Sequence, residues 1–504
     1  MASTAAIVFV KNDVDDIGWW MAHHLAVGFD ALIVIDDHST DGTWDVIQSA
    51  ASILPVEPQR TRPDDKSSYA ERRSDAYGLA IESCRNRFDW VICLESDEYV
   101  SPESAPDMSS FLSRFDQADG IFLNWSIFGS NGHVTRPTES PTSAYTRRAP
   151  LEFADHRPGK TFIRPDCFTG QFIDGCHWAI ASERYYRADG TLFDPEAPVN
   201  WQGARILHYL TRNLTHYTSR LARLPTPGQA TPDLWSHFNR NEVEDLEPRR
   251  FLAATREYAA RLGRVMLDTF YWRMRKDIQE NSLSFMPDTS LSIRSHQSMT
   301  SPRPLRFASL VTSAGETLAY DPLSHRLTFL PAGDVTSEGQ QVLLVMEHVE
   351  ARQDDDLSQP NGFLLLPSAI DTAPTAPGAF LTHWVPVHSD ACDDDAQAMA
   401  LFLPASAQWL SRDETGAMAL EPTASLRLTP QPVTPAQSIL SRIRPFHALR
   451  SYGDTLHDFC LGLDLLRAPQ ADAIACAIAH LPTSKRGLLQ TRYPGLIPPW
   501  LAQA

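Results

Sequence analysis

The sequence has little cysteine, and its cysteines form no recognisable framework. Seven are scattered over 504 residues, and none stands in a Cys-x-x-Cys pair. An odd, scattered set is typical of reduced thiols and argues against a disulfide-rich secreted fold. We therefore expect a cytoplasmic protein.

Long hydrophobic runs are also missing. No apolar segment reaches the roughly 18 residues that a membrane-spanning helix needs, so we expect no transmembrane segment. A peripheral membrane contact stays open. The chain opens on the apolar run 5–10 without a basic region before it, which argues against a secretory signal peptide.

Positive charge is in deficit. The chain has 44 lysines and arginines against 62 aspartates and glutamates, a net charge of −18. A nucleic-acid-binding protein would show a basic face, and broad docking to anionic lipid also requires cations. Both partner classes are therefore disfavoured. The length predicts two or three domains, and the oligomeric state is left open.

The first hundred residues alternate between strand and helix patterns. Short apolar runs predict strands, and helical periodicity between them predicts helices. The expected strands are 6–10, 31–35, 53–56 and 90–94, and the expected helices are 17–27, a segment from about 41 to 50, and 67–85. This βαβ series predicts an α/β fold with a mostly parallel, Rossmann-like sheet.

Acidic residues follow two of these predicted strands. Asp36-Asp37 ends one strand, and Glu95-Ser96-Asp97-Glu98 follows another. In open α/β sheets, ligands bind outside the carboxyl ends of the strands. The two clusters therefore predict one shared polar site, and its expected guest is a nucleotide diphosphate with Mn²⁺ or Mg²⁺. A solvated acidic loop is the alternative.

The spacing of the second cluster suits a divalent cation. Carboxylates at i and i+2 project to the same side of an extended chain, and hard cations bind through one or two carboxylates plus substrate phosphates. Asp97 is the preferred metal ligand. Glu95 is expected to reach the ribose, a metal-bound water or the metal itself. Glu98 supports the site, takes part in catalysis or caps the following turn.

Several ordered segments carry a resemblance to a known family. They are Lys11-Asn12-Asp13 with the helix 19–30, Asp36–Thr43, Leu94–Tyr99, Trp125–His133, Lys160–Pro165 with Gly175-Cys176-His177, and His208-Tyr209. Together they resemble GT-A glycosyltransferases, and among these the family-2-like group related to glycosyltransferase family 92, over about residues 5–245. Glu95 departs from this pattern, because the family has aspartate there, and the departure leaves the identity of the metal open.

The resemblance implies a nucleotide-sugar donor, UDP-linked, and transfer with inversion. Asn12 and Asp37 are then expected at the uracil and ribose end, with Asp36 supporting them. Arg72 or Arg73 is expected to approach the diphosphate, with a solvated helix face as the alternative.

The same resemblance proposes His177 and His208 as candidates for the late histidine that completes the metal shell in many GT-A enzymes. A lone histidine is more often structural.

The acceptor side follows from the same segments. Trp125, Phe128 and Gly129 are expected to form a platform for an acceptor sugar ring, although core packing is the competing account for Trp125. Inversion requires a general base. Asp174 is preferred to Glu152 and Asp155, because it directly precedes Gly175-Cys176-His177.

The pattern changes near residue 290. Short apolar runs with turn residues continue to about 430, and Leu-Pro pairs recur at near-equal spacing at Leu330, Leu366 and Leu403. We expect a GT-A domain at 1–290, an all-β domain at 301–432 and a C-terminal helical segment at 436–504. A β-trefoil is the first choice for the all-β domain and a sandwich the second, while chance Leu-Pro pairs are the alternative.

Three functions are compared. The preferred one is a metal-dependent glycosyltransferase that moves a hexose from a nucleotide sugar to a glycan or lipid-linked acceptor. Nucleotidyl transfer is disfavoured, because the loop after the first strand, 11–16, is acidic and lacks glycine. The non-enzymatic alternative is a degenerate GT-A protein whose all-β domain binds carbohydrate.

Overall fold

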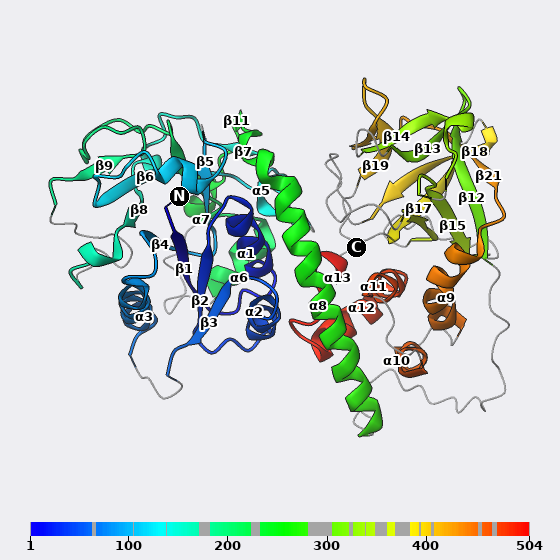
Figure 1. Cartoon of the computed structure of the whole chain (residues 1–504), viewed down its shortest axis with the longest axis horizontal. Helices are drawn as coiled ribbons and strands as arrows, with labels where there is room; N and C mark the ends of the chain where they lie inside the picture. The colour runs from blue at the N-terminus through cyan, green and yellow to red at the C-terminus, as the bar shows by residue number, and fades with distance from the viewer. Residues whose placement is uncertain are drawn as a thin grey trace. The chain divides into compact units, whose positions relative to one another are not determined.

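The computed structural model divides the chain into two compact units, Met1–Ala259 and Ala260–Ala504 (Figure 1). The boundary falls within the long helix α8 (Leu252–Gln279). The three predicted domains stay a prediction. The structure describes residues 2–62, 67–103, 105–137, 139–170, 182–222, 232–280, 305–321, 326–337, 339–347, 360–367, 384–392, 395–404, 408–451, 456–465 and 471–502.

A mixed sheet forms the centre of the first unit, where the sequence predicted a mostly parallel one. Its first four strands in spatial order are mutually parallel, and the other half of the sheet is mixed. The strands, in spatial order, are β3 (Val56–Arg60), β2 (Ala31–Asp36), β1 (Thr4–Val10), β4 (Trp90–Leu94), β8 (Gly159–Ile163), β6 (Gly120–Ile127), β10 (Ala204–His208) and β5 (Glu98–Pro102), with β9 (Tyr185–Arg187) paired to β6.

Strand register aligns the carboxyl ends of the parallel strands. Val10 pairs with Asp36, and Asp36 pairs with Arg60. Leu94, the last residue of β4, pairs with Val8 of β1. The loops that follow all four strands therefore leave the same edge of the sheet.

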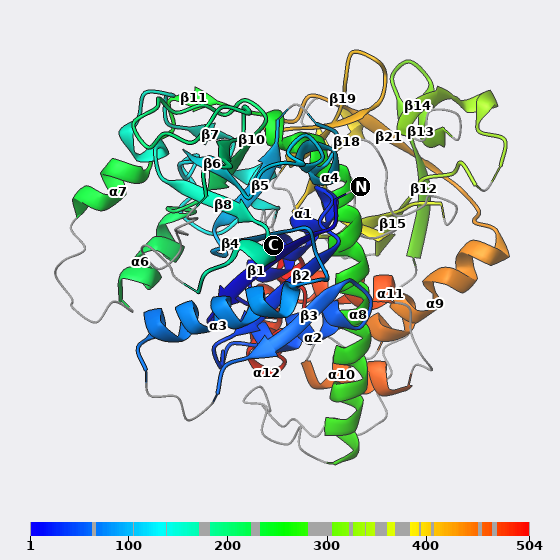
Figure 2. The same ribbon diagram turned by 60° about the vertical axis from the view of Figure 1, so that its left-hand side comes forward.

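Helices cover both faces of this parallel half (Figures 1 and 2). Alternate strand residues, among them Ile7, Ile33 and Val91, pack with Tyr77 and Ile81 of α3. Helices α1 and α2 contact each other and lie on the other side of the sheet. The helices of the unit are α1 (Ile17–Ala26), α2 (Thr43–Ala51), α3 (Tyr69–Cys84), α4 (Met108–Leu112), α5 (Pro141–Ala144), α6 (Leu214–Ala222) and α7 (Pro232–Phe238), and β7 (Arg147–Arg148) pairs with β11 (Val243–Glu244).

The second unit contains the predicted all-β region. Its described strands pair antiparallel, mostly with their neighbours in sequence, and the last strand returns to pair with both β12 and β18. The trefoil and the sandwich stay predictions. The strands are β12 (Leu305–Thr312), β13 (Glu316–Asp321), β14 (Arg326–Pro331), β15 (Leu343–Glu347), β16 (Gly362–Leu365), β17 (Trp384–Cys392), β18 (Asp395–Leu403), β19 (Gln408–Arg412), β20 (Met418–Glu421) and β21 (Leu428–Pro432).

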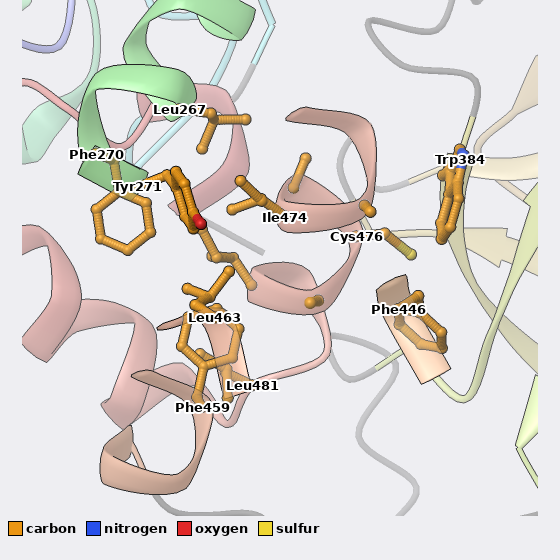
Figure 3. Close-up of a cluster of buried hydrophobic side chains, with 14 of the residues drawn as sticks. Leu267, Phe270, Tyr271, Trp384, Phe446, Phe459, Leu463, Ile474, Cys476 and Leu481 are labelled. Atoms are coloured by element: carbon orange, nitrogen blue, oxygen red, sulfur yellow. The ribbon is translucent and has the colours of Figure 1, made fainter. Parts of the chain in front are cut away.

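Helices follow the last strand and share an apolar core with this sheet. In Figure 3, Ile474 and Cys476 of α11 lie between Tyr271 of α8 and Trp384 of β17. Burial of such side chains is the main favourable term in folding. These helices are α9 (Gln437–Ser451), α10 (Leu456–Leu465), α11 (Ala471–Ala479), α12 (Thr483–Arg492) and α13 (Pro499–Ala502).

Two further expectations from the sequence can be compared with the structure: the strand at 53–56 and the lack of a membrane-spanning segment. The strand expected at 53–56 begins only at Val56 and runs to Arg60, because 52–55 form the turn that follows α2. The helices of the described segments include none that combines the length and apolar character of a membrane span.

Candidate functional site

The site lies at the carboxyl edge of the parallel strands. Asp37 follows β2, Thr61 follows β3, and Glu95 follows β4. The loop after β1 carries Asn12 and Asp13. The structure thus brings the two predicted acidic clusters to one edge, as the strand pattern indicated.

Asp37 is the most heavily bonded carboxylate of the first cluster. Its Oδ2 atom accepts from Lys11 Nζ at 3.0 Å and Arg72 Nη2 at 2.7 Å, and its Oδ1 atom accepts from Arg72 Nε at 2.8 Å and Thr61 Oγ1 at 2.9 Å. Asp37 is 2% exposed. Burial alone would raise the pKa of Asp37, but the bonds from Arg72, Lys11 and Thr61 lower it to about 2.

Asp36 and Asn12 hold the loops of this edge in place. The buried Asp36 carboxylate accepts from Arg60 Nε at 2.9 Å and from the Ser39 backbone N–H at 3.2 Å. Asn12 Oδ1 accepts from the Thr40 backbone N–H at 2.8 Å. The loops after β1, β2 and β3 are therefore bonded to one another, and the roles expected for Asn12 and Asp36 at the nucleotide stay predictions.

The first turn of α3 connects the two acidic clusters. Its backbone is fixed by a reciprocal capping box between Ser68 and Glu71. Arg72 bonds Asp37, and the next residue, Arg73, donates from Nη1 to Glu95 Oε1 at 2.9 Å. Adjacent side chains of one helix thus reach acids from strands β2 and β4.

Glu98 is buried and contacts three other residues around the acidic motif. It and Lys160 are each 1% exposed, and Lys160 Nζ lies 3.1 Å from Glu98 Oε2. The same Oε2 atom accepts from the Glu95 backbone N–H at 2.7 Å, while Oε1 accepts from Trp125 Nε1 at 2.8 Å. Burial raises the pKa of Glu98, and Lys160 opposes that rise. These contacts suit a positioning role for Glu98.

Asp97 and His208 form the candidate metal pair. Asp97 is 6% exposed, and His208 Nε2 lies 3.7 Å from Asp97 Oδ1, too far for a direct hydrogen bond. Among the described residues, neither ring nitrogen of the buried His208 has a hydrogen-bond partner. Burial would lower the pKa of His208, but Asp97, with Glu98 and Glu95, outweighs burial and raises it.

This pair fits a divalent cation only in part. An aspartate and a histidine with unsatisfied nitrogens can supply two ligands, and substrate phosphates and water can supply the rest. Among the described residues, no group of three or more histidine, cysteine or acidic side chains is arranged to hold a metal. Glu95, another of the four predicted metal ligands, is bonded by Arg73.

A charged network beneath the acidic motif was not predicted from the sequence. Ser96 Oγ donates to Asp13 Oδ2 at 3.1 Å. The buried Arg212 bonds Asp16, and its Nη1 atom lies 3.9 Å from Asp13 Oδ1. Arg136 Nη2 also bonds Asp16, at 2.5 Å. Burial raises the pKa of Asp13 to about 6, although Arg212 opposes the rise.

The two aromatic residues predicted for the acceptor site, Trp125 and Phe128, differ in burial and in their contacts. The partly exposed Trp125 packs its ring against His208, with centroids 4.5 Å apart. Phe128 is fully buried and packs on Tyr209. Of the two aromatic residues, Trp125 is the one placed to meet a ligand near Asp97, whereas the contacts of Phe128 are those of a core residue.

Gly129 is required by a close backbone approach. A Cβ atom there would lie 2.2 Å from the Arg240 carbonyl oxygen. We expect Gly129→Ala to lower the free energy of unfolding by about 1–3 kcal/mol, because the contacting backbone must shift. Urea denaturation measures the change, with Gly333→Ala as the comparison, because an added Cβ there would meet no described atom within 4 Å. Equal stability of Gly129→Ala and the unchanged protein would contradict the account.

Two predicted residues lie outside the described part of the chain, Asp174 and His177. Of the other base candidates, Glu152 is exposed and Asp155 bonds His237. Asp174 as the general base and His177 as a metal ligand stay predictions.

One protein-family model matches part of the chain. The model for glycosyl transferase family 2 matches residues 27–179. No curated protein sequence matches the chain. The matched segment contains both acidic clusters and the first turn of α3.

Solved structures of the S. aureus TarS fragment 1–349 are similar to part of the chain. The fragment is 14% identical, with 51% of this chain and 71% of that chain covered, at a TM-score of 0.25. The UDP-GlcNAc complex is 12% identical, with 53% and 80% covered, at 0.26. The UDP complex is 11% identical, with 52% and 83% covered, also at 0.26. Likeness at these scores adds nothing to the family match.

Proposed function

We propose that the chain is a metal-dependent, inverting glycosyltransferase that moves a hexose from a UDP-linked donor to a glycan or lipid-linked acceptor. The observation that carries the proposal is the bridge of Arg72 and Arg73 between Asp37 and Glu95. It links acids from two strand ends through adjacent residues of one helix. The family-2 match over residues 27–179 supports the same class of enzyme. We further propose that the chain is related to glycosyltransferase family 92.

The donor would lie along the strand ends. Asp37 and Asn12 would meet the ribose and uracil, and Asp36 would hold their loop. Cationic groups at this edge would offset the charge of the leaving diphosphate, which is the main electrostatic requirement of the transfer.

Asp97 and His208 would hold a Mn²⁺ or Mg²⁺ ion, which when bound would stabilise negative charge on the diphosphate. The contacts of Glu98 with Lys160 and with the Glu95 backbone N–H hold the loop 95–98 in position. Since protons compete with cations for His208, we expect the cation to bind less tightly as the pH falls.

The acceptor would lie over Trp125, whose indole is oriented by the bond to Glu98. Inversion requires a base at the acceptor hydroxyl, and Asp174 is our candidate. The competing proposal is a degenerate GT-A protein that binds carbohydrate through its all-β region. The acidic residues at 36, 37, 95 and 97 favour the enzyme.

Thermal unfolding with UDP tests the donor site. UDP with Mn²⁺, at about 100 times its dissociation constant, should stabilise the chain by roughly 2.7 kcal/mol. We expect the shift to disappear when a chelator removes the cation. A UDP shift that survives the chelator would contradict the metal role.

A mass-spectrometric screen of sugar nucleotides tests the activity itself. We expect slow hydrolysis of at least one UDP-linked hexose by the full chain. If no sugar nucleotide is hydrolysed while residues 300–430 bind glycans, the carbohydrate-binding alternative replaces the enzyme.

A further inference from the structure

The two adjacent arginines of α3 are held in different ways. Arg72 grips both oxygens of the buried Asp37, and it also donates to the Ser67 carbonyl oxygen. Asp37 has two further donors, Lys11 and Thr61. Arg73 instead contacts Glu95 through one nitrogen, Nη1, at 2.9 Å.

Burial adds to this difference. The Asp37 side chain is 3% exposed, whereas that of Glu95 is 33% exposed and that of Arg73 is 20% exposed. Two-pronged arginine–carboxylate contacts are strong and geometrically specific, while partly exposed single contacts contribute little. The Arg73–Glu95 contact is therefore easier to break than the Arg72–Asp37 contact.

Glu95 has a second possible partner close by. Lys160 Nζ lies 4.0 Å from Glu95 Oε1, the oxygen that Arg73 contacts. Asp97 is two residues further along the same loop. Glu95 therefore retains a nearby positive charge if Arg73 leaves, and its carboxylate lies in the loop that would meet a cation.

We propose that Arg73 is an exchangeable diphosphate-binding residue, which pairs with Glu95 in the donor-free protein and moves to the diphosphate when Glu95 turns toward the cation. This inference rests on the proposed function. It assigns Arg72 to holding Asp37 and separates two neighbouring residues that the sequence could not distinguish.

The exchange predicts a specific coupling between the two ligands. A cation that binds alone has to displace Arg73 from Glu95, whereas a cation that binds with the nucleotide leaves Arg73 a new anionic partner. Binding free energies are linked reciprocally, so Arg73 should weaken binding of the cation alone and strengthen binding of the cation–nucleotide pair.

A double-mutant cycle on the full chain tests the exchange. Mn²⁺ binding alone is followed by electron paramagnetic resonance, and UDP binding with Mn²⁺ by calorimetry, in the unchanged protein, Arg73→Gln, Glu95→Gln and the double variant. We expect Arg73→Gln to bind Mn²⁺ alone about two- to fivefold more tightly. We expect it to bind UDP with Mn²⁺ about 10- to 100-fold more weakly.

The cycle separates partner exchange from a general effect of charge. In the Glu95→Gln background, Arg73→Gln should change the affinity for Mn²⁺ alone by less than about twofold, because its competitor is already absent. An equal gain in both backgrounds would overturn the inference, and so would an unchanged or lower Mn²⁺ affinity in Arg73→Gln.

Two further variants complete the test. Arg85→Gln, at the other end of α3 and paired with Glu82, should leave both affinities unchanged. Arg73→Lys keeps the charge and should fall between the unchanged protein and Arg73→Gln, so it replaces Arg73→Gln if that variant does not fold. A protein that bound neither UDP nor Mn²⁺ would refute the proposed function as well, whereas cation-dependent UDP binding that Arg73→Gln left intact would refute the inference alone.

Discussion

Asp97→Asn should reduce donor hydrolysis by about 10³-fold, which corresponds to roughly 4 kcal/mol of lost transition-state stabilisation. The carboxylate is expected to bind the cation that offsets charge on the leaving diphosphate. Asparagine keeps the shape of the side chain, and the Asp97 backbone carbonyl still accepts from the Tyr209 N–H. The loss should therefore appear in activity and much less in stability.

Hydrolysis of the best UDP-linked hexose, followed by mass spectrometry, measures this effect. Asp116→Asn, at an exposed carboxylate outside the site, is the matched control and should retain full activity. If Asp97→Asn kept more than about a tenth of the rate, a loss too small for a metal ligand, the role assigned to Asp97 would be wrong.

Asp37→Ala should lower the free energy of unfolding by about 3 kcal/mol. The substitution leaves the largely buried Arg72 without the two-pronged carboxylate contact, and removing one partner of a buried ion pair is strongly destabilising. Urea denaturation measures the loss. Asp45→Ala, at a partly exposed acid on α2, is the comparison and should cost much less.

The same residue predicts an acid dependence. The folded pKa of Asp37 is lowered to about 2 from 3.8, so its stabilising contribution is fully present above about pH 4 and is lost as the pH falls toward 2. The contribution amounts to up to about 2 kcal/mol. Asp37→Ala should thus show a shallower loss of stability over this range, and curves of equal slope would contradict the assignment.

The sequence located those strands in which every residue is buried. Strands β1, β2 and β4 consist entirely of buried residues, so apolar runs marked them within two residues. Strand β3 lies at the edge of the sheet and reads Val-Glu-Pro-Gln-Arg. A polar edge strand gives no apolar signal, and the sequence therefore placed it too early.

In the candidate site, too, the sequence located some residues and missed others. The acids were found because they end buried strands, whereas their cationic partners come from distant segments. Lys160 and Arg212 are buried beside the acidic motif, yet no local pattern links residues so far apart in the chain. For Lys160, the sequence offered only the segment Lys160–Pro165 of the family resemblance. For Arg212, it offered only a position shortly after His208.

The central claim is that two strand-end acidic clusters form one nucleotide-sugar site. A crystal structure of the full chain with UDP and Mn²⁺ tests it most directly. The account predicts an anomalous manganese peak beside Asp97 and His208, with the diphosphate between that peak and the Asp37 side of the edge. Nucleotide bound elsewhere, or an edge that stays empty at saturating UDP and Mn²⁺, would contradict it.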